Sequence, residues 1–300
     1  MINNLRPLLY LIFLGASWGL YFSLLKLALL TGISYVGIAT VITAAVCLGM
    51  LLISMLRGKM PFFSRKHIYF YTVCALLGYL LPMLIELQVV EQMPVSVLTL
   101  IVSMSPIATL SFASLMRTDR INGRRIGGVV VGAVAIFAIL LPDAHASKSV
   151  AWHWLLLAAL VPASYALYHN VISRYWPEGS DSWQIACGES VLATVMMVGY
   201  SLINWQGDSF TGWNNGYTAI LIMSLIALLD IYIYFEVIRL RGPIFVSHAN
   251  YFMVVSGVFW AMIFFDEQPS PLLWLSAALL LLSLYLITEH GQKKTAPVDN

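Results

Sequence analysis

The chain of 300 residues is a series of long apolar runs separated by short polar connections. A helix that spans a bilayer needs about 20 predominantly apolar residues, and a scan on this basis predicts ten such helices. No connection is long enough to hold a soluble domain, so the pattern indicates an all-α integral membrane protein. The expected helices are Pro7–Leu29, Tyr35–Leu56, Ile68–Val90, Pro94–Met116, Arg125–Leu141, Trp152–Ser173, Ser182–Ile203, Gly216–Ile238, Pro243–Phe265 and Pro271–Glu289.

The composition excludes an ordinary soluble protein. Hydrophobic residues make up 60% of the chain, charged residues make up 10%, and the mean hydropathy is +0.84, whereas soluble domains carry about 25% charged residues. The net charge of +2 gives no basic field for a nucleic-acid partner. Because Cys47, Cys74 and Cys187 lie inside apolar runs, we expect buried thiols rather than disulfides or a zinc site.

The basic residues are divided unevenly between the two sides that the ten-helix pattern defines. Of the 16 Lys and Arg residues, 14 fall on one side, Lys148 lies on the other, and Lys26 lies inside the first helix. Short basic loops stay in the cytoplasm, so we expect both termini to be cytoplasmic. We expect the protein in the plasma membrane, which is the inner membrane of a bacterium. Residues 291–300 are polar, and we expect a disordered cytoplasmic tail.

An internal repeat relates the two halves of the chain. The first helix contains Gly15-Ala-Ser-Trp-Gly-Leu-Tyr-Phe, and the sixth contains Pro162-Ala-Ser-Tyr-Ala-Leu-Tyr-His. Five helices per repeat is an odd number, so the second copy must enter the membrane from the opposite face, and the loop charges agree. We therefore expect two inverted five-helix repeats, residues 1–145 and 146–290, which can exchange conformations and so give alternating access.

Three motifs in this arrangement are similar to those of a known family. Trp18-Gly19, Phe22 and Lys26 match the pattern W-G-x-x-F-x-x-x-K, Ser103-Met-Ser-Pro106 lies in the fourth helix, and Asp266-Glu267-Gln-Pro-Ser follows the ninth. With ten helices and the five-plus-five duplication, the chain resembles the drug/metabolite transporter superfamily, in its ten-helix EamA branch. It departs from the family pattern where the second helix lacks an Arg and where Val255-Ser256 replaces a counterpart of Pro106. The resemblance implies efflux or exchange of small metabolites, often amino acids, through a central cavity bounded by helices 1, 3, 4, 6, 8 and 9.

Polar and aromatic residues within the spans are the candidates for a binding site, because they are costly in lipid unless they face a cavity or a partner. Trp18 and Phe22 share a helix face, and the repeat puts Tyr165 and His169 at the equivalent positions. These faces could line one chamber, with packing between helices as the alternative. The predicted substrate-binding residues are Trp18, Tyr21, Phe22, Tyr79, Ser103, Tyr165, His169, Asp230, Tyr234 and Asn250.

Asp230 is the acid predicted to lie deepest, about 21 Å from the outer end of its helix. A carboxylate at that depth takes up a proton or pairs, which suits a proton carrier or a binder of amino groups. Since histidine titrates near neutral pH, Asp230, His169 and His248 are the candidates for proton coupling. A structural hydrogen bond to a neighbouring helix is the alternative for each.

Lys26 and Glu86 are predicted near the outer ends of the first and third helices. An ion pair between them would close an outer gate or grip a substrate carboxylate, and snorkelling of each side chain to the headgroups is the alternative. Tyr79 and Glu86 share a face of the third helix. Pro82, between them, is expected to kink the helix and free a carbonyl that a polar ligand could use.

Two further acids are interpreted as structural. Glu189 lies near the cytoplasmic start of the seventh helix, where we expect it to pack or pair. Glu236 precedes Arg239 by three residues, which favours a surface ion pair.

No enzyme is predicted from the motifs. Gly15-Ala-Ser17-Trp-Gly19 matches the letters G-x-S-x-G, but that motif works on a strand-to-helix turn and here it lies within a membrane helix. No nucleotide-binding motif occurs, and we expect no cofactor and no metal. We predict a secondary transporter that exports small metabolites, most of all amino acids. Uptake, flipping of a lipid-like solute and a non-transporting membrane sensor are the alternatives. The expected partners are the solute, protons and the bilayer, and the expected state is a monomer, with a dimer as the alternative.

Overall fold

The computed structural model contains only helices and connections among the residues that it describes, which confirms the all-α fold class. The expected tail and Lys148 lie outside the described residues. The described residues are 2–115, 123–140, 150–204, 207, 212–241, 243–246 and 248–287.

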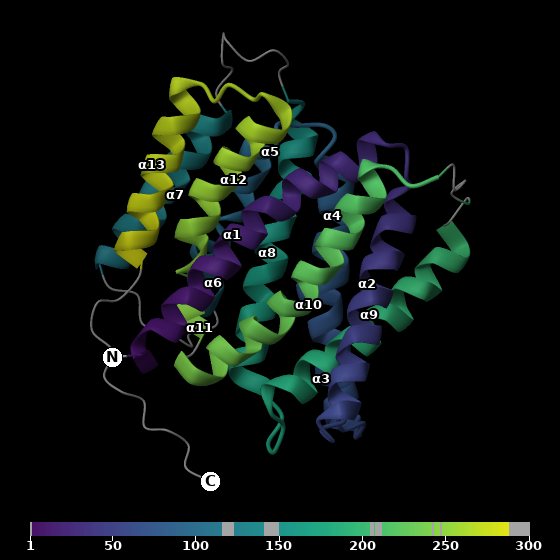
Figure 1. Ribbon diagram of the computed structural model, residues 1–300. Helices are drawn as coiled ribbons and strands as arrows, with labels where there is room; N and C mark the ends of the chain where they lie inside the picture. The colour runs from purple at the N-terminus through teal and green to yellow at the C-terminus, as the bar shows by residue number, and fades with distance from the viewer. Residues whose placement is uncertain are drawn as a thin grey trace.

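The helices pack together into one bundle (Figure 1). Their bounds are α1 Ile2–Leu30, α2 Tyr35–Leu56, α3 Arg65–Cys74, η1 Ala75–Leu80, α4 Leu81–Val89, α5 Val95–Val102, α6 Ser105–Leu115, α7 Gly123–Leu140, α8 Trp152–Tyr175, α9 Ser182–Asn204, α10 Asn215–Arg241, α11 Pro243–Val246, α12 Ala249–Phe265 and α13 Pro271–Ile287.

These elements form ten segments within the described part of the chain, as the hydropathy pattern predicts. α3, η1 and α4 run on without a gap, α5 and α6 are separated only by a turn at Ser103 and Met104, and α12 begins three residues after the end of α11. The ends differ slightly from the expected ones, since α1 begins at Ile2 and α10 ends at Arg241. The predicted ends at Met116, Leu141 and Glu289 are not among the described residues.

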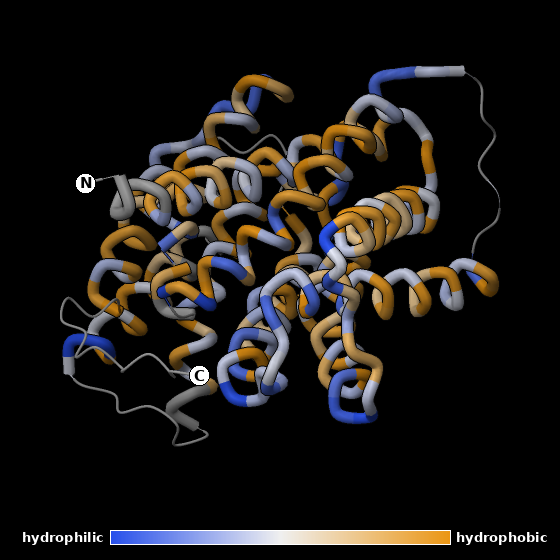
Figure 2. The backbone as a smooth tube through the Cα atoms, turned by 60° about the horizontal axis from the view of Figure 1, so that its bottom comes forward, coloured by the Kyte–Doolittle hydropathy of each residue, from blue (hydrophilic) through white to orange (hydrophobic). Residues whose placement is uncertain are grey.

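The outer surface of the bundle is apolar, as the interior of a bilayer requires. Seven of the described segments are long and apolar enough to cross a membrane, and α12 and α13 are shorter apolar helices of 17 residues each. Hydrophobic residues predominate along the helices and hydrophilic ones concentrate near their ends (Figure 2). The chain is therefore a multi-pass membrane protein. The seven segments are Pro7–Leu30, Tyr35–Leu56, Arg65–Val89, Val95–Phe112, Trp152–Tyr175, Ser182–Asn204 and Asn215–Arg241.

The packing of the helices repeats when each is replaced by its counterpart in the other half. α2 packs on its own counterpart α9, and α7 packs on its own counterpart α13. α1 packs on α12, and its counterpart α8 packs on α5 and α6 in the same way. α1 also packs on α10, and α8 correspondingly packs on α3, η1 and α4. Two five-helix halves related in this way, with an odd number of helices each, form the inverted repeat that the sequence predicts.

The third span contains a π-helical segment, η1, directly before Pro82. Its last bond runs from the Leu81 N–H to the Leu76 carbonyl, five residues earlier. The next bond in this pattern would join Pro82 to Leu77, but proline has no N–H. The Ser164 hydroxyl of α8 donates to the Leu77 carbonyl instead, at 2.7 Å. The expectation of a carbonyl free for a ligand is therefore wrong, because a neighbouring helix satisfies it.

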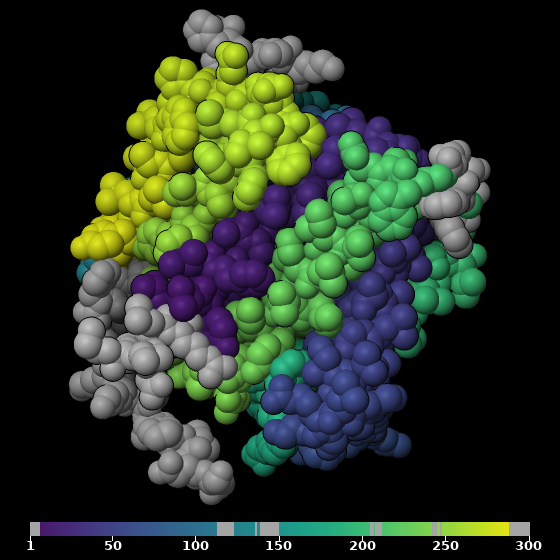
Figure 3. All heavy atoms as spheres, in the orientation of Figure 1, coloured from purple at the N-terminus to yellow at the C-terminus, as the bar shows by residue number. Residues whose placement is uncertain are grey.

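Glycine residues let α1 cross α12 at close range. A Cβ atom at Gly15 would meet the Ala249 carbonyl, and one at Gly19 would meet the side chain of Ser256. Figure 3 shows α1, in purple, packed between α12 and α10. The small residues thus bring a helix of each half into contact at the middle of the bundle.

Two of the smaller predictions are confirmed. The three cysteines are free and buried. Arg239 pairs with Glu236 at 2.8 Å, with the arginine half exposed and the glutamate buried.

Candidate functional site

A cavity of about 190 Å³ lies inside the bundle. At liquid density it has room for about six water molecules. Side chains from both halves line it, including residues of α2 and α9 in addition to the helices that were expected. Its lining residues are Trp18, Tyr21, Phe22, Ile42, Gly78, Tyr79, Met83, Glu86, Val102, Ser105, Tyr165, Tyr168, His169, Glu189, Ile226, Ala227, Asp230, Ile231, Tyr234, Val246, Asn250 and Met253.

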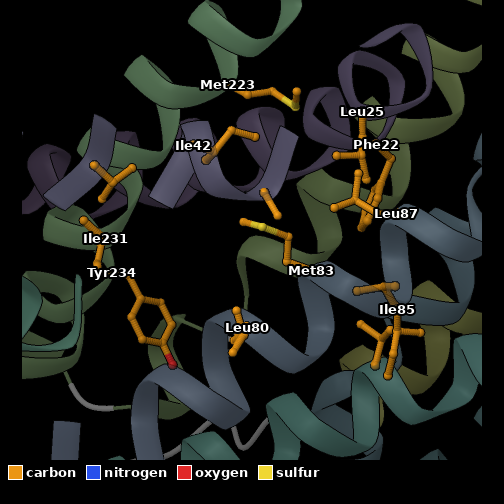
Figure 4. Close-up of a cluster of buried hydrophobic side chains, with 14 of the residues drawn as sticks. Phe22, Leu25, Ile42, Leu80, Met83, Ile85, Leu87, Met223, Ile231 and Tyr234 are labelled. Atoms are coloured by element: carbon orange, nitrogen blue, oxygen red, sulfur yellow. The ribbon is translucent and has the colours of Figure 1, made fainter. Parts of the chain in front are cut away.

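Most of the residues nominated from the sequence line this one cavity. They come from α1, η1, α4, α8, α10 and α12, which are far apart along the chain. Figure 4 shows part of the apolar lining, namely Phe22, Ile42, Met83 and Ile231, with Ile231 next to Tyr234. The nominated residues that line the cavity are Trp18, Tyr21, Phe22, Tyr79, Glu86, Tyr165, His169, Asp230, Tyr234 and Asn250.

Ser103 and His248 do not line the cavity. Ser103 lies where α5 ends, and its hydroxyl turns back to donate to the Thr99 carbonyl at 2.7 Å. The His248 Nδ1 lies 2.9 Å from the Phe245 carbonyl. A backbone carbonyl three or four residues earlier contacts each side chain, and neither residue is among the described lining residues of the cavity.

Lys26 and Glu86 do not form the expected ion pair. The Lys26 Nζ donates to the Met93 carbonyl at 3.2 Å and lies 5.1 Å from the centre of the Phe265 ring. Glu86 faces the cavity, where the Tyr165 hydroxyl donates to its Oε1 at 3.2 Å. The ion pair is therefore wrong for this conformation, because the Met93 carbonyl just before α5 and the ring of Phe265 attract the lysine while a tyrosine of α8 holds the acid.

The end of the bundle where Lys26 lies carries another polar contact between the halves. Glu267, in the connection after α12, accepts from the backbone N–H of Val95 at 2.7 Å and from the Ser96 hydroxyl at 2.6 Å. The first N–H groups of a helix have no partner within the helix and attract anions. The acid of the Asp266-Glu267 motif therefore caps α5 from the other half.

Asp230 is hydrogen-bonded to one hydroxyl. Ser17 lies 2.8 Å from its Oδ1 and 3.0 Å from its Oδ2, and the same hydroxyl lies 3.0 Å from the Leu14 carbonyl. A serine has a single hydrogen to donate, and an ionised carboxylate accepts about four hydrogen bonds. Asp230 therefore keeps acceptor capacity for a ligand with N–H donors.

Glu189 belongs to the cavity, which sequence reasoning missed. Its Oε2 accepts from the Tyr168 hydroxyl at 3.1 Å, and both residues line the cavity. The expectation that Glu189 packs or pairs near the start of α9 was based on its depth along the helix alone. Its charge within a span was the signal that could have identified it, since intramembrane acids face cavities by default.

Tyr234 stands at the centre of an aromatic wall. Its ring stacks on Tyr168 with centroids 5.8 Å apart and on His169 at 6.0 Å, and it lies 6.3 Å from Trp18. The hydroxyls of Tyr234 and Tyr79 are buried and have no hydrogen-bond partner among the described residues. An orphan buried hydroxyl is costly, so both hydroxyls favour a ligand that accepts or donates hydrogen bonds.

The described lining residues include three carboxyl groups and one imidazole but no Lys or Arg. Ser17, Tyr165 and Tyr168 supply one hydroxyl to each of Asp230, Glu86 and Glu189. The imidazole belongs to His169, whose Nδ1 lies 3.3 Å from the Thr109 hydroxyl. Such a set of acceptors among aromatic faces suits a ligand with a cationic group. The described residues contain no group of three or more His, Cys, Asp or Glu side chains that could hold a metal ion.

Comparisons with known proteins agree with this architecture. A model of the EamA-like transporter family matches residues 5–141 and again residues 152–289. An uncharacterized transporter of Synechocystis sp. is 27% identical over 215 residues, which cover 65% of this chain and 64%, less than two thirds, of that relative. A solved structure titled only "Crystal structure of protein" has a TM-score of 0.58 and 14% identity, over 91% of this chain and 98% of that one. That likeness concerns the fold alone.

Proposed function

This chain belongs to the EamA-like transporter family, and from that premise we propose that it carries a small amino-bearing metabolite across the membrane by alternating access. Amino acids are the leading substrate class. The inverted halves support the mechanism, because they can exchange conformations around a site between them. We propose residues 1–145 and 146–290 as these halves, and a monomer as the unit that transports, since one chain supplies the whole cavity.

The observation that carries the proposal is the polarity of the cavity around Asp230. This carboxyl has one hydroxyl partner, Ser17, and spare acceptor capacity. A substrate ammonium has three N–H donors to offer it. The unpartnered hydroxyls of Tyr79 and Tyr234 would donate to the substrate carboxylate. An amino acid satisfies both needs at once.

We propose that protons share this site with the substrate. Asp230 either binds the ammonium group or takes up a proton when the site is empty, because a bare carboxylate in a span is costly. His169 contacts Tyr234, one turn from Asp230, and is the second candidate for a proton carrier. His248 is not part of this proposal because it does not line the cavity.

The direction we propose is export, with both termini in the cytoplasm. The resemblance supports the direction, and the one-sided basic loops support the orientation. Arg57 and Lys59 contact Trp183 and Asp181 at one end of the bundle, and the ends of α8 and α10 lie at that same end (bottom of Figure 1). Faster transport in inside-out vesicles than in whole cells would agree with export.

Lys26 remains our candidate for the outer gate, with different partners from those expected. Its contacts with Met93 and Phe265 tie α1 to the start of the fourth span and to α12. In an outward-open state these contacts would have to separate.

The test is counterflow of labelled amino acids in proteoliposomes, with and without a pH gradient. Wild type should exchange at least one amino acid, and Asp230→Asn should reduce exchange by about tenfold or more, because hydrogen bonds to charged groups contribute about 1.5–3 kcal/mol. Glu236→Gln is the matched control, since Glu236 is an acid of the same helix that faces Arg239 rather than the cavity.

Two outcomes would count against the proposal. If another metabolite exchanges and no amino acid does, the substrate class is wrong. If Asp230→Asn leaves both exchange and its pH dependence at the wild-type level, Asp230 is not the site.

A further inference from the structure

We propose that the substrate carries two cationic groups, as a dibasic amino acid does, and that Glu189 binds the second one. This inference rests on the proposed function and narrows its substrate class. It assigns the α-ammonium group to Asp230 and the side-chain cation to the Glu189 carboxyl, which lies on α9 at the cytoplasmic half of the cavity.

The charges of the cavity are the first reason. Its described lining residues supply three carboxyls and no Lys or Arg, and each carboxyl receives one hydroxyl. A neutral amino acid brings one ammonium and one carboxylate, so its own charges cancel. A dibasic amino acid brings a net positive charge and the additional N–H donors that a second carboxyl needs.

The arrangement of Asp230 and Glu189 is the second reason. Tyr234 follows Asp230 by one helical turn and stacks on Tyr168, whose hydroxyl donates to Glu189. Tyr79 lines the same cavity, and its hydroxyl has no hydrogen-bond partner among the described residues. One aromatic wall therefore joins the two carboxyls, and an aliphatic chain with a cation at its end can lie along it.

The repeat supplies the third reason. Ile42 of α2 is the counterpart of Glu189 in the repeat, because these two residues are as far apart in the chain as the counterparts Ser17 and Ser164. Ile42 also lines the cavity. Because one half folds with isoleucine at this position, the fold itself does not require an acid there. A carboxyl buried at 1% exposure without a structural need is better explained by a ligand.

The test uses three probes that differ in one group each. Lysine has both ammonium groups and the carboxylate, norleucine lacks the distal ammonium, and cadaverine lacks the carboxylate. In counterflow, wild type should exchange lysine about tenfold or more faster than norleucine, which corresponds to one charged hydrogen bond. It should exchange cadaverine more slowly than lysine, because the hydroxyls of Tyr79 and Tyr234 then lose their acceptor.

The variant that carries the test is Glu189→Gln. The ratio of lysine to norleucine exchange should fall to about one in this variant and stay at the wild-type level in Glu236→Gln. Stabilisation against heat by each ligand is measured in parallel in detergent, because binding raises the unfolding temperature even of a variant that does not transport. Lysine should lose its excess stabilisation over norleucine in Glu189→Gln.

The outcomes separate this inference from the proposed function. Exchange of norleucine at or above the rate of lysine by wild type overturns the inference and leaves amino-acid transport intact. An unchanged ratio, together with an unchanged excess stabilisation, in Glu189→Gln removes the assignment of Glu189. Exchange of cadaverine faster than lysine overturns the carboxylate site. Absence of exchange with every amino acid contradicts the proposed function itself.

Discussion

Ser17 and Ser164 show how one residue type serves two purposes in the two halves. They occupy equivalent positions of α1 and α8. Ser17 donates to α10, and Ser164 donates to η1 of the third span, which is the counterpart of α10 in the other half. Ser17 reaches the carboxyl of Asp230, whereas Ser164 reaches the backbone carbonyl of Leu77, which Pro82 leaves without its usual donor. The first serine contacts the proposed substrate site, and the second stabilises the packing of the third span.

The role of Ser164 predicts an interaction between two distant substitutions. Ser164→Ala should lower the free energy of unfolding by about 0.5–2 kcal/mol, because the Leu77 carbonyl loses its donor. In a Pro82→Ala background the loss should be smaller, since alanine restores an N–H for that carbonyl. A double-mutant cycle of thermal unfolding in detergent measures the difference.

Ser173→Ala is the control for this cycle, because Ser173 is exposed on the same helix and bonds only within it. Equal costs of Ser164→Ala in both backgrounds would show that the two residues do not share the carbonyl.

At the scale of elements, the crossing of α1 and α12 depends on glycine residues, which have no side chain. Gly15 and Gly19 lie one turn apart on α1, and both approach α12 too closely for a Cβ atom. Gly257 of α12 in turn approaches Thr99 of α5. A stack of small residues therefore brings three helices of the two halves together beside the cavity.

This crossing predicts a difference between two glycine substitutions. Gly19→Leu should destabilise the protein by about 1–3 kcal/mol, as overpacking does, because the new side chain meets Ser256 and the backbone of Gly257. Gly127→Leu is the matched control on α7, where nothing lies within 4 Å of the added Cβ. Thermal unfolding in detergent compares them, and an equal loss in both would exclude the crossing as the cause.

At the scale of the whole molecule, polar contacts join the halves at both ends of the bundle. At one end, Glu267 caps α5. At the other end, Asp181 begins α9 by accepting from the backbone of Trp183 and Gln184, and the Gln184 side chain accepts from the Asp181 N–H in return. Lys59, in the connection after α2, pairs with this same Asp181 at 2.6 Å.

The Lys59–Asp181 pair predicts a pH dependence of stability. Partial burial alone would raise the pKa of Asp181, but the hydrogen bonds from Lys59 and Gln184 outweigh it and hold this pKa below its usual range. A carboxyl with a lowered pKa in the folded state contributes stability that is fully present above its unfolded pKa of about 3.9. That contribution is lost as the pH falls below about 3.9 through the lower, folded value.

Asp181→Asn isolates the charge, because asparagine is also a good first residue for a helix. Near pH 7 this variant should be less stable than wild type by less than about 1 kcal/mol, since the pair is partly exposed. The difference in unfolding temperature should disappear between about pH 4 and pH 2. A difference that persists at pH 2 would contradict a role for the carboxylate charge.

The sequence by itself determined the ten spans, the two halves and most of the polar and aromatic residues that line the cavity. Each of these follows from a local cost: an apolar run of sufficient length is stable only in lipid, and Trp18, Tyr165 and Asp230 must turn away from lipid to find partners. The repeat then brought α1 and α8 to equivalent positions. None of this requires knowledge of how one helix is rotated against the next.

Only the tertiary structure decided which partner each polar group finds. Lys26 contacts Met93 and Phe265 rather than Glu86, and the hydroxyl of Ser164 occupies the carbonyl that Pro82 leaves free. Depth along a single helix placed Glu189 outside the site, yet the structure includes it. The physical reason is that the partner of each polar group depends on the rotation and tilt of its helix. The close helix crossing at Gly19 and the π-helical turn before Pro82 set this rotation and tilt through contacts between segments far apart in the chain.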